Sequence, residues 1–167
     1  MNNGRSQRLR PYVCSALIIF SSQLHLSYAE SCGIASGTPS PGVISMNNER
    51  LNVLGSKLQQ CGCTPMTGFF RDGFCRTDER DFGSHTVCAI VSEQFLTFTK
   101  SQGNDLSSPA PNYGFPGLKP GDKWCLCVRR WKDAYEAGVA PKVVLEATDA
   151  SALKVVTLEQ LMEHSVQ

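Results

Sequence analysis

The segment from Pro120 to Trp131 constrains the fold more than any other part of the chain. It contains both tryptophans and a Cys-x-Cys pair, and its apolar residues predict a strand over residues 123–128. The next residues predict a helix over 129–137, which Gly138 is placed to end. We therefore interpret this segment as a central strand and helix whose tryptophans form a wall for the neighbouring loops.

The flanking sequence predicts further strands and helices without strict alternation. Strands are expected over residues 50–54, 85–91 and 142–147, and residues 152–156 fit either a strand or a helical turn. One helix is expected to begin after the N-cap Ser92, and a last helix after Thr157. This mixture predicts an α+β fold: a small two-layer sandwich in which two or three helices pack on a mixed sheet.

Two long stretches rich in proline or glycine interrupt these elements. Residues 67–82 show neither helical nor strand periodicity, and four prolines in residues 104–121 exclude a helix or a ladder strand there. Long irregular stretches in small domains are usually functional or disordered. We expect Tyr113, Phe115 and Leu118 to attach the second stretch to the body by burial.

The N-terminus resembles a targeting segment. Residues 1–29 contain three arginines, a short apolar run and small residues before Glu30, which is the layout of a secretory signal peptide. An organellar transit peptide and a retained anchor are the alternatives, and we favour the secretory route slightly. We expect residues 30–49 to be a flexible spacer and residues 50–167 to form one globular domain.

Charge and motifs exclude several classes of function. After position 29 the chain has 13 basic and 15 acidic residues, so binding to nucleic acid, or to a membrane once the leader is removed, is not expected. The sequence contains no glycine-rich nucleotide loop, no His-Glu-x-x-His and no Gly-x-Ser-x-Gly. Nucleotide binding, metalloprotease chemistry and serine hydrolysis therefore lack a motif.

Several motifs together resemble a known family. They are Asn-Val-Leu-Gly (52–55), Thr-Gly-Phe-Phe-Arg-Asp-Gly (67–73), Gly-Ser-His-Thr-Val-Cys-Ala (83–89), Gly-Asn-Asp-Leu (103–106), Phe-Pro-Gly-Leu-Lys-Pro-Gly-Asp-Lys-Trp-Cys-Leu-Cys (115–127) and Gly-Val-Ala-Pro (138–141). Over residues 51–164 the chain resembles the largely bacterial family called domain of unknown function 2237. The resemblance implies a small α+β sandwich and no established reaction or cofactor. Phe74 and Asp149 depart from the family pattern, which has a cysteine and a histidine there.

The cysteines and His85 carry the chemistry in the sequence. Cys75 lies in an irregular loop near Asp72, with His85 ten positions later. We predict a catalytic or redox site of Cys75, His85 and Asp72, in which a neighbouring arginine favours the thiolate. In this interpretation Cys75→Ser abolishes activity and leaves the melting temperature nearly unchanged.

A metal site and structural cysteines are the alternatives. Cys88, Cys125 and Cys127 are the candidate metal ligands, and zinc is the metal that such thiolates would hold, although the Cys-x-Cys spacing is shorter than is usual for zinc. Buried or disulfide-bonded structural cysteines explain the same residues without a site. Six cysteines allow 15 pairings, among which the sequence does not choose.

A small-molecule pocket is the last candidate site. Arg71, Asn104, Asp105 and Trp124 are polar or aromatic residues in or beside the long loops, and they are the candidate ligand-binding residues. In the structural alternative, Asn and Asp cap turns and the tryptophan is a core anchor. The sequence therefore predicts a thiol-based enzyme or redox protein centred on Cys75. The alternative is a non-catalytic small-ligand or zinc-binding module with structural cysteines.

Overall fold

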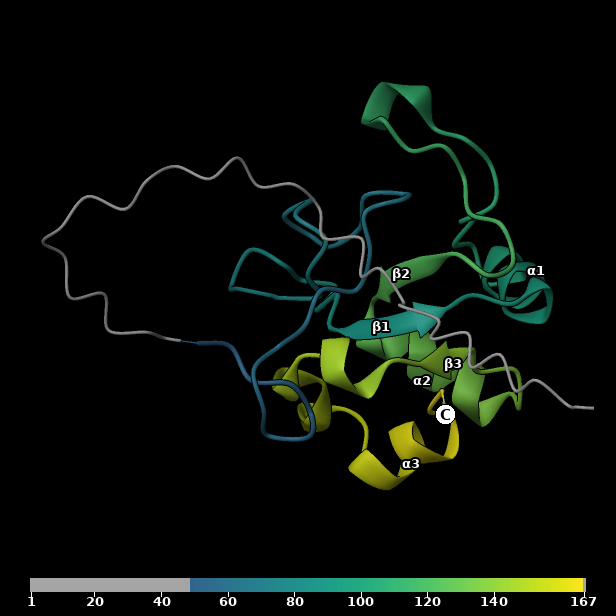
Figure 1. Cartoon of the computed structure of the whole chain (residues 1–167). Helices are drawn as coiled ribbons and strands as arrows, with labels where there is room; N and C mark the ends of the chain where they lie inside the picture. Colours follow the sequence, from purple (N-terminus) through teal and green to yellow (C-terminus); the bar gives the residue numbers. More distant parts are fainter. Residues whose placement is uncertain (1–48, 167) are drawn as a thin grey trace, which may run out of the picture.

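The computed structural model describes residues 49–166 of the 167-residue chain (Figure 1). The predicted leader over residues 1–29 and nearly all of the predicted spacer lie outside the described residues. Within the part that is described, no helix has the length and the apolar character needed to cross a membrane.

A small sheet forms the centre of the fold. Strands β1 (Val87–Ile90), β2 (Lys123–Leu126) and β3 (Lys142–Val143) lie in the order β2-β1-β3, and both pairings are antiparallel. Cys88 of β1 faces Cys125 of β2 directly across the ladder. The predicted α+β sandwich is confirmed, with an antiparallel sheet where we expected a mixed one, because parallel pairing within residues 49–166 is limited to isolated bridges.

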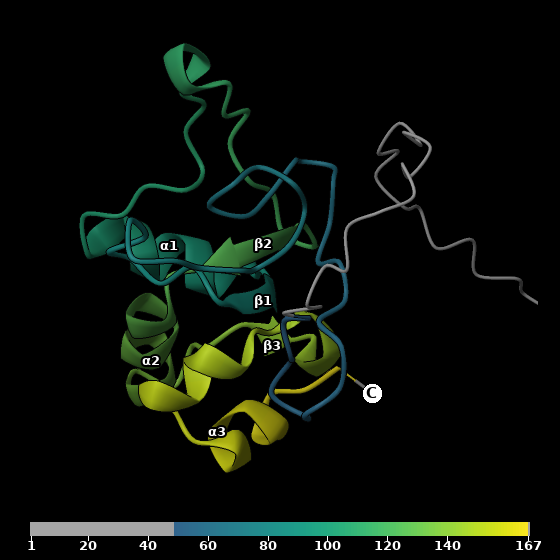
Figure 2. The ribbon, with the colours of Figure 1, turned by 90° about the vertical axis from the view of Figure 1, so that its left-hand side faces the viewer.

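Three α-helices accompany the sheet: α1 (Glu93–Ser101), α2 (Val128–Glu136) and α3 (Leu158–Glu163). The Ser92 side chain caps α1, and Thr157 forms a capping box at the start of α3, as the sequence predicted. In Figure 2, α1 and α2 lie to the left of the sheet and α3 lies below them. The helices thus form the second layer.

Residues 50–54 do not form the predicted strand: Leu51 and Asn52 make only isolated antiparallel bridges, and the chain turns directly after them. The Asn52 side-chain oxygen accepts hydrogen bonds from the backbone N–H groups of Leu54 and Ser56, at 3.0 and 3.1 Å. Gly55 has a φ of 79°, which reverses the chain at low cost only because glycine has no Cβ. Local side-chain bonds therefore override the alternating pattern.

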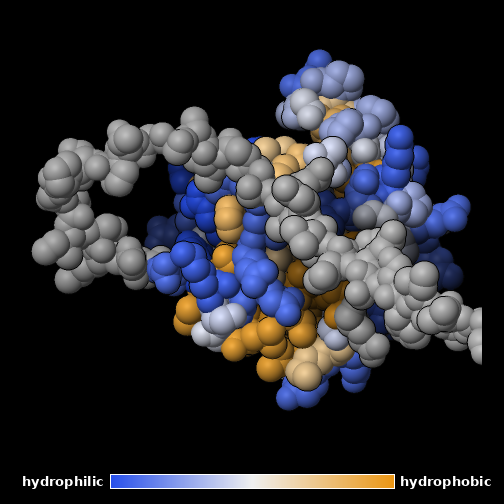
Figure 3. Space-filling view, viewed as in Figure 1, coloured by the Kyte–Doolittle hydropathy of each residue, from blue (hydrophilic) through white to orange (hydrophobic). Residues whose placement is uncertain are grey.

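The C-terminal part contains 3-10 turns between its strand and its helix. The strand predicted over 142–147 stops after β3, and the chain continues into turns at Leu145–Ala147 and Ala150–Lys154. The second turn resolves the ambiguous segment in favour of a helical turn. Figure 3 shows apolar residues gathered on the lower part of one face, where Figure 1 draws these turns and α3.

The core gathers around Trp131 of α2, which is fully buried. Phe95, Leu126 and Leu161 bring side chains from α1, β2 and α3 into the same cluster. The Trp131 indole N–H donates to the Pro141 carbonyl at 3.2 Å, so its polar atom is also satisfied. The tryptophans of the β2–α2 segment thus pack in the core as expected, but the prediction of a central strand there is wrong, because β2 lies at the edge of the sheet and β1 is its middle strand.

Residues 104–120 form a loop that projects away from the body, as Figures 1 and 2 both show. We call it the projecting loop. Leu118 is buried and Phe115 packs against the core, but Tyr113 is 83% exposed, so the expectation that it anchors the loop is wrong. At Gly117 (φ 80°), an added Cβ would lie 2.4 Å from a carbonyl oxygen of the opposite arm, so the two arms meet where only glycine fits.

Candidate functional site

A pocket of about 340 Å³ lies between the loop before β1, the projecting loop and the start of β2. Its lining includes Arg71, His85, Asp105, Tyr113 and Trp124. We call it the His85 pocket. The structure thus gathers in one place His85 and three of the four residues predicted to bind a ligand; their roles stay predictions.

Asp81 holds His85 in a fixed orientation. The Asp81 carboxylate accepts a hydrogen bond from the backbone N–H of His85 at 2.8 Å, and its other oxygen lies 2.6 Å from the His85 Nδ1. The Asp81 side chain is 1% exposed, whereas that of His85 is 39% exposed. No group within residues 49–166 bonds to the second ring nitrogen, Nε2. His85 therefore combines a fixed ring with a ring nitrogen that a ligand can use.

Neighbouring residues restrict the space around the His85 imidazole. A Cβ added at Gly83 would lie 2.5 Å from His85 Cε1, so the ring occupies space that any larger residue would fill. Phe69 stacks over the imidazole with ring centroids 6.4 Å apart. Ser84, between Gly83 and His85, has a left-handed φ of 49°. Unfavourable backbone geometry of this kind persists where the surroundings enforce it.

The pKa of Asp81 reflects two opposing effects. Burial of the carboxyl raises its pKa, but hydrogen bonds from the backbone and ring of His85, together with the attraction that this ring exerts when it is protonated, outweigh burial. The net pKa lies below the usual value for aspartate. Asp81 is therefore a carboxylate at neutral pH and favours a proton on Nδ1 of His85.

Arg71 supplies a positive charge at the mouth of the His85 pocket. Its guanidinium lies over the ring of Trp124, 5.0 Å from the centroid, and donates to the Met66 carbonyl at 3.2 Å. Within residues 49–166 no carboxylate pairs with Arg71. Trp124 itself packs against Phe115. The Arg71 guanidinium and the Trp124 ring therefore lie together in the lining of the His85 pocket.

The side chains of Asp105 and Asn104 bond mainly to neighbouring residues of the chain. Asp105 accepts hydrogen bonds from the backbone and hydroxyl groups of Ser108 and forms an ion pair with Lys100 at 3.0 Å. These bonds from Ser108 and then Lys100 lower the pKa of Asp105 well below its usual range. Asn104 donates to the Thr99 hydroxyl at the end of α1. The turn-capping alternative is therefore present for Asp105, which also lines the pocket, whereas the Asn104 side chain bonds to a side chain of α1.

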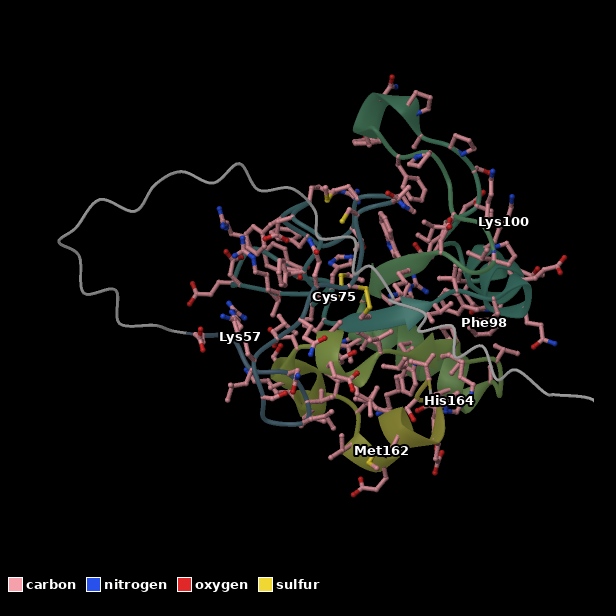
Figure 4. The ribbon with its side chains drawn as sticks, in the orientation of Figure 1. Lys57, Cys75, Phe98, Lys100, Met162 and His164 are labelled. Carbon is pink, nitrogen blue, oxygen red and sulfur yellow. A yellow bond between two sulfur atoms is a disulfide. The ribbon has the colours of Figure 1, made fainter. Side chains whose placement is uncertain are left out.

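Two disulfides lie beside β1, where Figure 4 labels Cys75. They join Cys61 to Cys88 and Cys75 to Cys125, and all four residues are buried. The Cys75 sulfur is therefore not a free thiol here, and the predicted nucleophile can act only after its disulfide is reduced. Two of the predicted metal ligands, Cys88 and Cys125, lie in different disulfides.

Asp72 lies apart from His85, with which it was predicted to share a catalytic site. It forms an ion pair with Arg76 at 2.6 Å and accepts the Phe74 N–H, and it lines another pocket than His85 does. The structure thus does not join Cys75, His85 and Asp72 as one free catalytic group.

Cys127, the third predicted metal ligand, is the one free cysteine within residues 49–166 and is half-buried. It is the N-cap of α2 and lines an adjoining pocket of about 250 Å³ together with His85, Asn104 and Arg130. The free thiol and the oriented histidine therefore share one cavity.

The sequence reasoning missed Asp81 and Gly83. Asp81 lies four positions before His85, a spacing that suggests a side-chain contact only if the intervening chain turns. The Ser84 N–H donates to the Asp81 carbonyl at 2.9 Å and closes such a turn. The Asp-Phe-Gly-Ser-His run (81–85) is the available signal, and it spans the boundary between the predicted irregular stretch and the predicted strand.

Comparison with known proteins gives one match. The family model described as "Uncharacterized protein conserved in bacteria (DUF2237)" matches residues 51–165, most of the chain and nearly all of the described part. No curated protein matches the chain. The family brings no function with it, so the argument for one rests on the site.

Proposed function

We propose, for a chain that belongs to the DUF2237 family of uncharacterised proteins, that it binds a small aromatic or planar organic anion in the His85 pocket. The observation that carries the proposal is His85, oriented by the buried Asp81, in the wall of the same pocket that presents Arg71 and Trp124. A volume of about 340 Å³ is within the usual range for small-ligand sites.

The charge at the pocket favours an anion. Arg71 has no carboxylate partner in the described part of the chain, so its charge is available to a ligand. Asp105 also lines the pocket, but Lys100 and Ser108 already engage its carboxylate. A carboxylate or phosphate could form a bidentate charge-assisted bond with the Arg71 guanidinium.

The aromatic lining favours a planar apolar part on the ligand. Phe69, Tyr113, Phe115 and Trp124 all contribute to the pocket, and Tyr113 is largely exposed. Aromatic rings offer large apolar area at low cost in conformational entropy and stack well against planar groups. An aromatic carboxylate fits this combination better than an aliphatic one.

His85 supplies the polar contact opposite the anion. With Nδ1–H donating to Asp81, a neutral imidazole presents Nε2 as an acceptor. A ligand hydroxyl or N–H group would donate to it, and a reaction in this pocket would begin with removal of that proton by His85.

A ligand-detected NMR screen tests the proposal with matched pairs of an aromatic carboxylate and its neutral amide. We expect the carboxylates to bind and the amides to bind at least tenfold more weakly. Arg71→Met should remove the preference, whereas Arg129→Met, at an exposed position on α2 outside the pocket, should keep it. Equal binding of acids and amides to the unmodified chain would refute the anion site.

Thiol chemistry at Cys127 is the second candidate function. It is favoured by the shared cavity of Cys127 and His85 and by the position of the thiol at the start of α2. In this alternative His85 accepts the thiol proton and Asp81 stabilises the imidazolium, with Cys127 in place of Cys75 as nucleophile. Loss of turnover in Cys127→Ser, with ligand binding retained, would separate it from the first candidate.

We also propose that the chain reaches an oxidising compartment through a cleaved N-terminal leader, with the secretory route slightly favoured. The basic and apolar pattern of residues 1–29 supports this, and the two disulfides are compatible with such a compartment. N-terminal sequencing of the protein from its native host tests it. A mature start near residue 30 is expected, and a start at Met1 would contradict cleavage.

A further inference from the structure

The two disulfides form one compact sulfur cluster. The sulfur atoms of Cys61, Cys75 and Cys125 all lie within 4.8 Å of one another, and the Cys88 sulfur is bonded to that of Cys61. Sulfurs from both disulfides are thus mutual neighbours. The cluster sits in a small apolar core of its own, together with Ala147.

We propose that these four cysteines, once reduced, form a zinc site. In a tetrahedral zinc–tetrathiolate centre the Zn–S distance is about 2.3 Å, which places neighbouring sulfurs about 3.8 Å apart. Distances of up to 4.8 Å among the sulfurs of Cys61, Cys75 and Cys125 need to close by about 1 Å to reach that arrangement. Both S–S pairs also need to open, and the Cys88 sulfur, which lies outside that close group of three, needs to move toward Cys75 and Cys125. Thiolate ligands select zinc among the common divalent ions.

The backbone of the strand cysteines is held by bonds other than the disulfides. Cys88 and Cys125 are cross-strand partners in β1 and β2. The Cys88 N–H donates to the Thr148 hydroxyl at 3.1 Å, and the Cys125 N–H donates to the Thr67 hydroxyl at 2.8 Å. Reduction therefore leaves these two ligand positions in place.

The loop cysteines are held in a similar way. The Cys61 N–H donates to the Gly73 carbonyl at 2.8 Å, and Cys75 forms a bridge with Thr148. Two loop cysteines thus face two strand cysteines. Cys125 also lines the His85 pocket, so the Cys75–Cys125 bond lies close to that pocket.

Two equivalents of a dithiol reductant supply four electrons and four protons, which cleave both disulfides to four thiols while each dithiol is oxidised to its disulfide. One Zn²⁺ then replaces four thiol protons, which are released, and leaves a tetrathiolate complex. Two equivalents of a small-molecule disulfide, which accept four electrons, would re-form both protein disulfides and release the zinc ion.

The test is zinc stoichiometry on the full chain after reduction with a dithiol, removal of the reductant under argon and addition of zinc, with free metal removed by gel filtration. We expect about one zinc per chain in the unmodified protein and in Cys127→Ser, and loss of the tightly held zinc in Cys75→Ser and Cys88→Ser. Cobalt should give the absorption of tetrahedral thiolate ligation in the first two proteins only.

The same variants also detect unfolding of the reduced chain. If the reduced chain unfolds, its thiols would bind zinc equally well whichever cysteine is replaced, and the variants would not differ in zinc content. Equal zinc retention in Cys75→Ser and Cys127→Ser would overturn the proposal, as would the absence of zinc from the reduced unmodified chain. The oxidised protein should hold no zinc in the cluster.

Discussion

The carboxylate of Asp81 accepts two hydrogen bonds from His85, one from its backbone N–H at 2.8 Å and one from Nδ1 at 2.6 Å. One buried side chain thus fixes both the backbone and the ring of its partner. This relationship ties the loop before β1 to the wall of the His85 pocket.

Replacing Asp81 with Asn should destabilise the protein by about 1–3 kcal/mol at pH 7, because His85 loses a charged hydrogen-bond partner. The folded-state pKa of Asp81 is lowered, so its contribution is present above the unfolded value near 3.8 and is lost as pH falls through the folded value. Urea unfolding of both proteins at pH 7 and near pH 3 measures this. The difference in unfolding free energy between the unmodified protein and Asp81→Asn should be smaller near pH 3 than at pH 7. A larger difference near pH 3 would contradict a lowered pKa for Asp81.

Replacing Gly83 with Ala should displace the His85 ring, because the new Cβ would lie 2.5 Å from Cε1. The ring nitrogens in NMR spectra should then lose the signature of the Asp81 contact. In a His85→Ala background the same substitution should have little effect, because the obstructing ring is gone. An equal loss of stability in both backgrounds would place the strain in the backbone instead.

Replacing Cys75 with Ser should lower the melting temperature, contrary to what the sequence alone suggested. The Cys75–Cys125 bond spans 50 residues, and closing a loop of that length stabilises a fold by about 4 kcal/mol in the chain-entropy model. Cys127→Ser is the matched control, since serine is a favoured N-cap and should leave stability unchanged or slightly raised. Calorimetry in non-reducing buffer that gave the same melting temperature for Cys75→Ser and the unmodified chain would exclude a structural role.

Native alkylation should modify Cys127 and spare Cys61, Cys75, Cys88 and Cys125, since the four are buried in disulfides. Peptide mapping after iodoacetamide treatment, without reductant, gives the site. Cys127→Ser should abolish labelling in the described part of the chain. Label on Cys75 in the folded protein would show that its disulfide is open, and would restore it as a candidate nucleophile.

The helices and the strand-to-helix segment could be predicted from sequence because their signals are local. The caps at Ser92 and Thr157, the terminator Gly138 and the apolar run of β2 each act within a few residues. The turn that follows Asn52 could not be predicted, because the Asn52 side chain competes with strand pairing there.

The site was predictable in part. Arg71, His85 and Trp124 stood out by residue type, and the structure brings them to one pocket. The cysteine pairing was out of reach, because it depends on which loop folds over which strand. The Asp81–His85 contact depends on a turn within a stretch without periodicity.

The measurement that tests the central claim most directly is isothermal titration of the best aromatic carboxylate from the screen into the unmodified chain and into Arg71→Met, His85→Asn and Arg129→Met. A saturable one-to-one isotherm is predicted for the unmodified chain and for Arg129→Met. Affinity should fall at least tenfold, about 1.4 kcal/mol, in the two pocket variants. Unchanged affinity in both Arg71→Met and His85→Asn would show that the ligand binds elsewhere and would contradict the account.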